Sequence, residues 1–475
     1  MIQEWDYKRA LAELWRRSSY ERGLISDPFG DSARAEQGLE RMRRLLGELG
    51  NPHQTLPAVH IAGSKGKGST GAFVASAATA AGHRVGFYSS PHLHRFPERL
   101  AIDGHPLPDD AFATEAQLVA AAAKRLETSE PDTGQVTTFE MLTAMAFNAF
   151  ARHGCRLAVI EVGLGGRYDS TNVMDPVVSV ITRIDLEHTA VLGSTYADIA
   201  WQKAGILRRG VPSVSSPQLP AALETIVAAA AEVGSPLQFA GQDWSWDGTW
   251  RSFEAKGPWG VFSHLALGIR GPHQVENACT ALAALHHVDA AGIPVSEESI
   301  RNGLAAARWP GRFERITVGN RDIVFDGAHT PAAAGALVEA WHDSEGAVRG
   351  TVVLGMGADK DASAFLRALQ PLIGHLIVTR ADSPRAADVD VIARSASALR
   401  IPHEIQSSVA AAVDAAKARD GESILITGSL FVVGEGREAF GLAEPDLEWL
   451  ALNRGATSPP NTDSRPEKST VRQRI

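Results

Sequence analysis

Cysteine is nearly absent from this sequence. Only Cys155 and Cys279 occur among its 475 residues. Two cysteines cannot build a disulfide framework or a zinc site made of paired thiols. This usage is typical of a protein from a reducing compartment, and we expect both thiols to be packed side chains.

Long apolar runs are missing as well. No stretch offers the roughly 18 uninterrupted apolar residues that a membrane span requires. The chain starts with MIQEWDYKRALAELWRR, which is charged throughout and lacks the apolar segment of a targeting sequence. We therefore expect a cytoplasmic protein with no membrane partner.

An excess of positive charge is also missing. Lysine and arginine number 46 against 55 aspartates and glutamates, which leaves a net charge of −9. This balance argues against nucleic acid or an anionic membrane as the main ligand, although it leaves room for a local basic pocket. At 475 residues the chain exceeds the size of one hydrophobic core, so we expect two domains and a monomer that folds without a partner.

Short β-rich runs alternate with alanine-rich helical runs along most of the chain. In the first part the strand-like runs are PAVHIAG, RVGFYSS, RLAVIEVG and VVSVITRID, and a second series contains RDIVFDG, TVVLGMG, HLIVTR and ESILITGS. This alternation predicts an α/β fold with parallel strands and helical crossovers. The sequence predicts one domain over 1–308, a second over 309–453, and a disordered tail over 454–475 that is poor in apolar residues.

Residues 240–270 differ from the rest in their many tryptophans, glycines and alternating apolar positions. This pattern predicts antiparallel hairpins at the edge of the first domain. We expect the tryptophans to serve packing rather than ligand stacking.

The segment HIAGSKGKGST, residues 60–70, runs from an apolar strand through a glycine-rich loop into a helix. Backbone N–H groups and a lysine can converge on a polyphosphate in such a loop. Its spacing departs from the strict G-x-x-x-x-G-K-[ST] pattern, because Gly68 separates Lys67 from the hydroxyl of Ser69. The alternative is a strand-to-helix turn that merely needs glycine. The candidate phosphate-binding residues are Gly63, Ser64, Lys65, Gly66, Lys67, Gly68 and Ser69.

Three candidate metal ligands follow three predicted strands. Ser90 follows RVGFYSS, Glu161 ends LAVIE, and His188 lies beyond VVSVITRID. The carboxyl ends of parallel strands meet at the ligand-binding edge of an open sheet, and a buried carboxylate is costly unless paired or metal-bound. These residues predict a mixed magnesium site. The alternatives are a simple turn at Ser90 and a structural role for His188.

Further polar residues fall at similar places. Lys203 stands on a predicted helix with apolar neighbours, where a lysine needs a partner or a chemical modification. Asn277 lies near the start of another predicted helix, and Arg312 lies at the predicted domain joint. In the second domain, strand-end loops carry the residues Asp326, His329, Asp359, Lys360, Asp361 and Ser429. These positions predict a site for two substrates in the cleft between the domains.

The ordered motifs resemble those of the folylpolyglutamate synthase and dihydrofolate synthase family, relatives of the Mur ligases. The resemblance extends from Tyr20 to about Trp449 and rests on GLERMRRLLGELGNP, GSKGKGS, SPHL, TTFEMLTAMAF, EVGLGGRYDSTN, HTAVLGST, KAGI, HQVENA, WPGRFE, DGAH, GADKD and ITGS. It implies a P-loop, Mur-ligase-like ATPase domain with a mainly parallel sheet, followed by a smaller Rossmann-like α/β domain. It also implies an amide ligase that moves the γ-phosphoryl group of ATP to a carboxylate and then lets an amino acid attack the acyl phosphate.

The resemblance assigns roles to individual residues. It implies that the loop with Lys67 holds the ATP phosphates and that Asn277, Arg312 and Asp326 also contact ATP. Ser90, Glu161 and His188 would bind Mg²⁺, and a carbamylated Lys203 would support a second ion. His329 and Ser429 would hold the incoming amino acid, L-glutamate. Thr137, Phe139 and Asp169 match positions that contact the pterin substrate in bifunctional members. The catalytic set implied in this way is Lys67, His188, Lys203 and Arg312.

The sequence departs from the family pattern at three positions. Thr330 replaces an asparagine in DGAHT, Gln202 replaces a common glutamate, and Lys65 replaces a frequent asparagine in the glycine loop. Three interpretations stay open: a synthase that adds L-glutamate to dihydropteroate, reduced folate or both; a ligase of this fold with another acid or amino acid; and a nucleotide-binding protein without ligase activity. Thr330 is the only support for the second.

Overall fold

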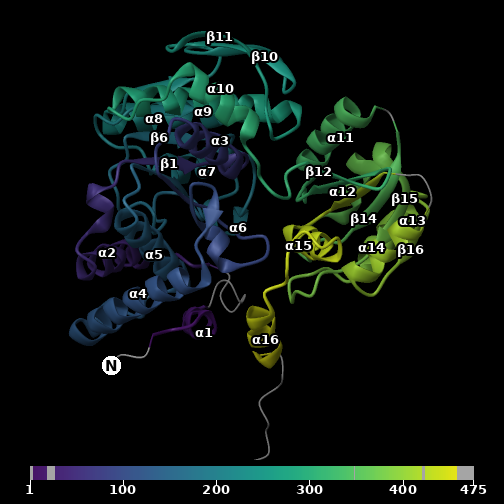
Figure 1. The fold of residues 1–475 in the computed structure, drawn as a ribbon, viewed down its shortest axis with the longest axis horizontal. Coiled ribbons are helices and arrows are strands. Elements are labelled where there is room, and N and C mark those ends of the chain that lie inside the picture. The colour runs from purple at the N-terminus through teal and green to yellow at the C-terminus, as the bar shows by residue number, and fades with distance from the viewer. Residues whose placement is uncertain (1–3, 19–26, 31, 347, 420–422, 457–475) are drawn as a thin grey trace, which may run out of the picture.

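Two sheets organise the computed structural model, which describes residues 4–18, 27–30, 32–346, 348–419 and 423–456. Figure 1 shows them in two bodies, one built from the purple-to-teal part of the chain and one from the green-to-yellow part. The first sheet has eight strands in the order β4-β3-β2-β5-β1-β6-β7-β8, and the second has six in the order β12-β13-β17-β14-β15-β16. The α/β fold with mainly parallel sheets is confirmed.

The first sheet is parallel except at one edge. Its strands are β1 (Ala58–Ala62), β2 (Val85–Tyr88), β3 (Leu100–Ile102), β4 (His105–Pro106), β5 (Leu157–Glu161), β6 (Val178–Ile181), β7 (Ser213–Ser215) and β8 (Leu237–Phe239). Among these strands, β3 pairs in antiparallel fashion with both β2 and β4, and the other pairs are parallel. Every residue of β1, β2, β5 and β6 is buried. Burial on both faces explains why these strands read as continuous apolar runs in the sequence.

Helices cover both faces of this sheet. They are α1 (Tyr7–Arg17), α2 (Ser32–Glu48), α3 (Lys67–Ala80), α4 (Asp109–Ser129), α5 (Thr138–Arg152), α6 (Thr189–Leu192), α7 (Tyr196–Ala204), α8 (Pro220–Val233), α9 (Pro272–Ala290) and α10 (Glu297–Ala306). Ala58 and Ile160 belong to the apolar cluster of α1, α2, α4 and α5, whereas Val59 and Val159 belong to that of α3, α9 and α10. Alternate residues of a strand therefore pack into two separate hydrophobic cores, one on each face of the sheet.

The hairpins predicted over 240–270 are present. Strands β9 (Ser245–Thr249), β10 (Ser252–Gly257) and β11 (Gly260–Leu265) form a separate antiparallel sheet. Trp244 is buried in the cluster below α9, and Trp246, Trp250 and Trp259 pack against it. The packing role expected for these tryptophans agrees with this placement.

The second sheet is parallel apart from its edge strand β12. It contains β12 (Glu314–Val318), β13 (Arg321–Asp326), β14 (Gly350–Leu354), β15 (Ile373–Val378), β16 (His403–Ile405) and β17 (Ile424–Thr427), with α11 (Pro331–Glu345), α12 (Ala362–Leu369), α13 (Val389–Ala398), α14 (Val409–Ala418) and α15 (Leu430–Ala439) around it. The boundary that we place at 308 and 309 falls between α10 and β12 and remains a proposal.

The last described helix, α16 (Leu447–Ala456), returns to the first body. Its Trp449 ring lies 4.9 Å from Trp15 of α1 and 4.6 Å from Phe96, centroid to centroid. Just before the helix, Asp446 accepts a hydrogen bond of 2.5 Å from the Tyr7 hydroxyl. This helix overlaps the start of the predicted tail over 454–475, and residues 457–475 lie outside the described residues.

The α16 contacts predict a stabilising role for Trp449. Replacing Trp449 with alanine removes two aromatic contacts and should lower the free energy of unfolding by about 2 kcal/mol. Leu447→Ala on the same helix is the control, because Leu447 is 70% exposed. Urea unfolding of both variants checks this, and equal midpoints would show that α16 adds no stability through Trp449.

Both cysteines are free and buried, as expected. Burial raises the pKa of the Cys155 thiol to about 12, so this thiol stays protonated. Among the described residues, no helix is long and apolar enough to cross a bilayer.

Candidate active site

The predicted metal ligands and the glycine loop follow four neighbouring parallel strands. In the order β2, β5, β1 and β6, Tyr88 pairs with Ile160, Ile61 with Glu161, and Ala62 with Ile181. The segments that carry Ser90, Glu161, the loop over 63–66 and His188 therefore leave the sheet at one edge. This is the edge where open α/β sheets bind ligands.

The glycine loop ends at Lys67, the first residue of α3. Gly66 has a φ of 92°, and a Cβ there would lie 2.2 Å from Oδ1 of Asn277. A Cβ on Gly68 would lie 2.9 Å from Nε1 of Trp309. Glycine is therefore required by close packing against α9 and the domain joint. The first-turn N–H groups over 67–69 have no partner within the helix, so they are able to donate to an anion.

Lys67 and Glu161 form the centre of the site. The Lys67 ammonium donates to the carbonyl of Gly63 at 2.9 Å. Burial raises the pKa of Glu161 to about 7, against the opposing effect of the Lys67 and Arg312 charges and of the backbone N–H of Ser90. These interactions bring together Lys67, Ser90, Glu161 and Arg312, which come from separate parts of the chain.

His188 is the N-cap residue just before α6 and has a left-handed conformation with a φ of 49°. This conformation is unfavourable for a side chain with a Cβ and is found at functional sites. Burial lowers the pKa of His188, and the charges of Lys203 and Lys67 lower it further against the opposing effect of Glu187. The imidazole is therefore neutral near pH 7 and keeps a lone pair for a ligand.

The donor set fits a divalent cation. Ser90, Glu161 and His188 offer a hydroxyl, a carboxylate and a neutral imidazole at one sheet edge. The described residues contain no group of three or more His, Cys, Asp or Glu side chains able to hold a metal alone. A cation bound there would complete its shell with water and phosphate oxygens, which is the usual behaviour of Mg²⁺.

Lys203 is almost fully buried on α7, as its apolar neighbours predict. Its ammonium donates to the carbonyl of Gly63 at 2.8 Å and lies 3.3 Å from Oε1 of Glu187. The other carboxylate oxygen of Glu187 lies 3.4 Å from Nζ of Lys65. Burial lowers the pKa of Lys203 to about 8 even though Glu187 opposes this shift.

Glu187 was not among the site residues predicted from the sequence. Burial opposes ionisation of this carboxyl, but the charges of Lys203, Lys67 and Lys65 outweigh it and hold its pKa at about 2. Glu187 is thus the anion that pairs with the buried lysine. The available signal was that a buried lysine needs an acidic partner and that a glutamate stands directly beside His188.

In the second body, the Asp326 carboxylate forms hydrogen bonds with the backbone around the end of β13. Its two carboxylate oxygens accept hydrogen bonds from the backbone N–H groups of Phe313, at 2.8 Å, and Ala328, at 2.9 Å. Arg312 stands beside this loop, because a Cβ on Gly327 would lie 2.5 Å from its guanidinium. Asp326 therefore ties the domain joint to the end of β13. Its contact with ATP remains a prediction.

His329 and Ser429 follow two adjacent strands, since β13 pairs with β17. Burial lowers the pKa of His329, and the charges of Lys65, Lys360 and Arg312 lower it further against the opposing hydrogen bond of the Gly327 carbonyl. Positively charged side chains from both bodies thus lie near enough to lower the pKa of this imidazole. The hydroxyl of Ser429 caps α15 by accepting from the N–H of Phe431 at 3.1 Å.

The side chains predicted to contact a pterin also make contacts with neighbouring groups of the protein. Thr137 caps α5 in a capping box with Glu140. A Cβ on Gly163 would lie 2.3 Å from the Phe139 ring, so this ring packs on the loop after β5. Asp169 lies within that loop and accepts from its backbone. The structure thus joins Phe139 to the Asp169 loop, while a substrate contact of these residues remains a prediction.

Asn277 lies against the glycine loop and donates to Oε1 of Gln274 at 2.9 Å. The hydroxyl of Thr330 accepts from the N–H of Ala333 at 3.3 Å and caps α11. Ser64 and Lys65 both donate their backbone N–H to the carbonyl of Arg183. These hydrogen bonds do not show whether Asn277, Ser64 and Lys65 contact ATP, so their predicted role in ATP binding remains a proposal.

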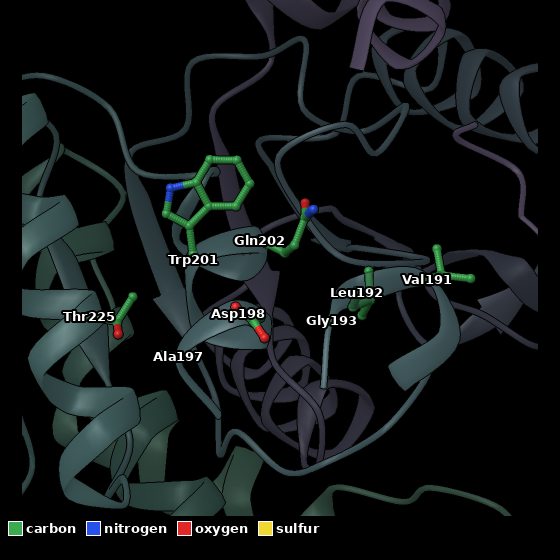
Figure 2. A pocket seen from close by; sticks show the side chains of 8 residues that line it. All are labelled: Val191, Leu192, Gly193, Ala197, Asp198, Trp201, Gln202 and Thr225. Atoms are coloured by element: carbon green, nitrogen blue, oxygen red, sulfur yellow. The ribbon is translucent and has the colours of Figure 1, made fainter. Parts of the chain in front are cut away.

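A shallow cavity of about 550 Å³ lies beside α7. Figure 2 shows it lined by Val191, Leu192, Gly193, Ala197, Asp198, Trp201, Gln202 and Thr225. None of the predicted site residues lines it. The side-chain oxygen of Gln202, which replaces the common glutamate, is buried and without a hydrogen-bond partner in the described part of the chain.

Comparisons with known proteins match these features. Residues 311–430 match the family described as Mur ligase, glutamate ligase domain. The dihydrofolate synthase/folylpolyglutamate synthase of Mycobacterium tuberculosis is 35% identical over an alignment 456 residues long, which covers 88% of this chain and 93% of the relative.

Comparison with solved structures gives the same family. The folylpolyglutamate synthase of M. tuberculosis, solved with ADP and AMPPCP, has a TM-score of 0.81 at 31% identity and covers 92% of this chain and 100% of its own. The Escherichia coli FolC protein, solved with DHPP and ADP, has a TM-score of 0.79 at 31% identity and covers 92% of this chain and 98% of its own. With these likenesses along nearly its whole length, the chain belongs to the dihydrofolate synthase/folylpolyglutamate synthase family of Mur-type ligases.

Proposed function

We propose that this protein joins L-glutamate to dihydropteroate, to a reduced folate, or to both, with ATP as the energy source. The observation that carries the proposal is the buried Glu161 carboxylate beside Lys67, Arg312 and the Ser90 N–H. These positive charges beside a carboxylate, next to the glycine loop, support the proposal that a triphosphate and a cation bind here.

The reaction has two steps. A carboxylate oxygen of the acceptor attacks the γ-phosphorus of ATP, the bond to the bridging oxygen breaks, and ADP leaves. The amino group of glutamate then attacks the carbonyl carbon of the acyl phosphate, phosphate leaves, and the new amide loses a proton. A carboxylate is a poor acyl donor, so the phosphoryl group makes the second step possible.

The protein contributes charge and alignment. Lys67 and the N–H groups over 67–69 would hold the phosphates, and Arg312 would neutralise charge during transfer from the domain joint. His329 and Ser429 would hold the glutamate, with Lys65 and Lys360 supplying positive charge for its carboxylates. Exclusion of water from the cleft would protect the acyl phosphate.

Magnesium supplies charge neutralisation of the phosphate oxygens in such a reaction. We assign Ser90, Glu161 and His188 as its protein ligands and a carbamylated Lys203 as support for a second ion. The low pKa of Lys203 supports the carbamylation, because only the neutral amine reacts with CO₂.

ADP release by the purified protein with ATP and magnesium tests this proposal. Dihydropteroate and tetrahydrofolate are compared as acceptors, each with and without L-glutamate, and product masses are read in parallel. We expect release that requires an acceptor and glutamate together. Release that needs neither would favour a nucleotide-binding protein without ligase activity.

A second candidate is a ligase for a different amino acid or acid. Thr330 favours it, because the family asparagine beside His329 is replaced by a threonine whose hydroxyl caps α11. A panel of amino acids in the same assay decides between them. A preference for L-glutamate over the other amino acids, in turnover with dihydropteroate or tetrahydrofolate, would exclude the second candidate.

We further propose a cytoplasmic monomer whose partners are small molecules. The near absence of cysteine supports the location. The net charge of −9 supports the absence of a nucleic-acid partner.

A further inference from the structure

A chain of three buried polar side chains runs beneath the site. His60 of β1 and Thr171 are fully buried, and Asp169 is 2% exposed. Nε2 of His60 lies 2.9 Å from the Thr171 hydroxyl, and this hydroxyl donates to Oδ1 of Asp169 at 2.6 Å. The single hydroxyl proton points to Asp169, so His60 must donate from Nε2.

This assignment fits the state of His60. Burial lowers its pKa to about 3, so the imidazole is neutral. Its Nδ1 is buried with no hydrogen-bond partner in the described part of the chain. Every other residue of β1 is apolar, and an apolar side chain at 60 would avoid this unpaired nitrogen. The hydrogen bond to Thr171 therefore accounts for the imidazole.

At the other end, Asp169 fixes the segment over 163–171. Its Oδ2 accepts from the N–H of Leu164 at 2.9 Å, and its Oδ1 also accepts from the N–H of Thr171 at 3.0 Å. Leu164 stands three residues after Glu161. The carboxylate thus determines how the chain leaves β5 after the candidate metal ligand.

The segment over 163–171 packs between the Phe139 ring and the backbone of α7. On one side Gly163 lies against the Phe139 ring. On the other, the N–H of Arg167 donates to the carbonyl of Gln202 at 2.8 Å, and a Cβ on Gly166 would lie 2.9 Å from the Lys203 carbonyl. A shift of this segment would displace the surroundings of Phe139 and Lys203 together.

We propose that His60 and Thr171 are positioning residues, which orient the Asp169 carboxylate and through it hold residues 163–171 in place for the acceptor substrate. This inference rests on the function proposed above. It gives the Asp169 carboxylate a role inside the loop in addition to its predicted contact with the pterin.

Thr171→Val tests the proposal, because it removes the hydroxyl with little change of shape. Loss of a buried hydrogen bond to a charged group is worth about 1.5–3 kcal/mol, so kcat/KM for the acceptor should fall by roughly 10- to 100-fold. Thr171→Ser keeps the hydroxyl and should restore most of the activity. Affinity for ADP, measured by calorimetry, should stay within about twofold of the original.

Thr280→Val is the matched control. Thr280 is equally buried, but its hydroxyl donates only to the Glu276 carbonyl of its own helix at 2.9 Å. We expect this variant to keep acceptor kinetics. If Thr171→Val and Thr280→Val lose acceptor turnover and stability to the same degree, the positioning role is wrong.

Hydrogen exchange supplies a readout that does not depend on turnover. Peptides that contain Leu164 should exchange faster in Thr171→Val and in His60→Leu than in Thr171→Ser or Thr280→Val. Unchanged exchange at Leu164 would overturn the proposal. If the unaltered protein uses neither acceptor, the proposed function fails, while the exchange result still decides whether His60 and Thr171 hold the segment.

Discussion

Replacing Glu161 with glutamine should nearly abolish ligation while it stabilises the ligand-free protein at pH 8. The amide keeps the shape of the side chain but removes the negative charge that a cation requires. Removing one electrostatic group at a reacting phosphoryl centre costs about 10²- to 10³-fold in rate, and loss of the only carboxylate in this donor set should reach the upper value. Steady-state ADP release with saturating substrates measures this effect.

The stability effect has the opposite sign because burial raises the pKa of Glu161 to about 7, above its ordinary value of 4.5. The folded state therefore binds the proton more tightly than the unfolded state, and this stabilisation is complete below pH 4.5 and lost as the pH rises through 7. By pH 8 the loss amounts to about 3 kcal/mol. Glu161→Gln does not titrate, so its advantage over the original should grow between pH 5 and pH 8.

Glu435 offers a matched control on α15. Burial raises its pKa to about 7 as well, against a hydrogen bond from the N–H of Asp382. Glu435→Gln should therefore share the gain in stability at pH 8 and keep its ligase activity. Urea unfolding at both pH values, without ligands, tests both variants. An active Glu161→Gln would show that Glu161 holds no essential cation.

The strand-end residues were predictable because burial of a parallel strand on both faces leaves a continuous apolar run. The runs before Ser90, Glu161 and His188 identified three strands, and the parallel arrangement placed their carboxyl ends together. The glycine loop was predictable for the same reason, since it follows the apolar run of β1. The short strands β7, β8 and β16 carry only three residues each, which is too few for a periodic signal.

Pairing between distant side chains was not predictable. The apolar neighbours of Lys203 predicted that this lysine needs a partner. Its contact with Glu187, however, depends on how α7 packs against the loop after β6. The resemblance predicted a pterin contact for Asp169, but nothing in the sequence indicated that its carboxylate accepts a hydrogen bond from the N–H of Leu164. The return of α16 to α1 also left no local signal, because it depends on the path of the chain around both bodies.

Lys203→Arg should lower ligation by about 10²-fold or more, although it keeps the positive charge. Burial holds the pKa of Lys203 at about 8, so an appreciable fraction of this amine is neutral near pH 7. The neutral nitrogen can attack CO₂ and form a carbamate with release of a proton, which turns a cation into an anion. Arginine stays protonated and cannot follow this route.

Bicarbonate separates this chemistry from a loss of the ion pair with Glu187. The original protein should lose activity when CO₂ is removed from the buffer and regain it when bicarbonate is added. Lys203→Arg should remain low under both conditions, and Lys203→Glu, which supplies a carboxylate directly, should recover part of the activity without bicarbonate. Formation of the carbamate should speed up from pH 7 to pH 8 as the amine loses its proton. Full activity of Lys203→Arg would show that a cation at this position suffices and that no carbamate takes part.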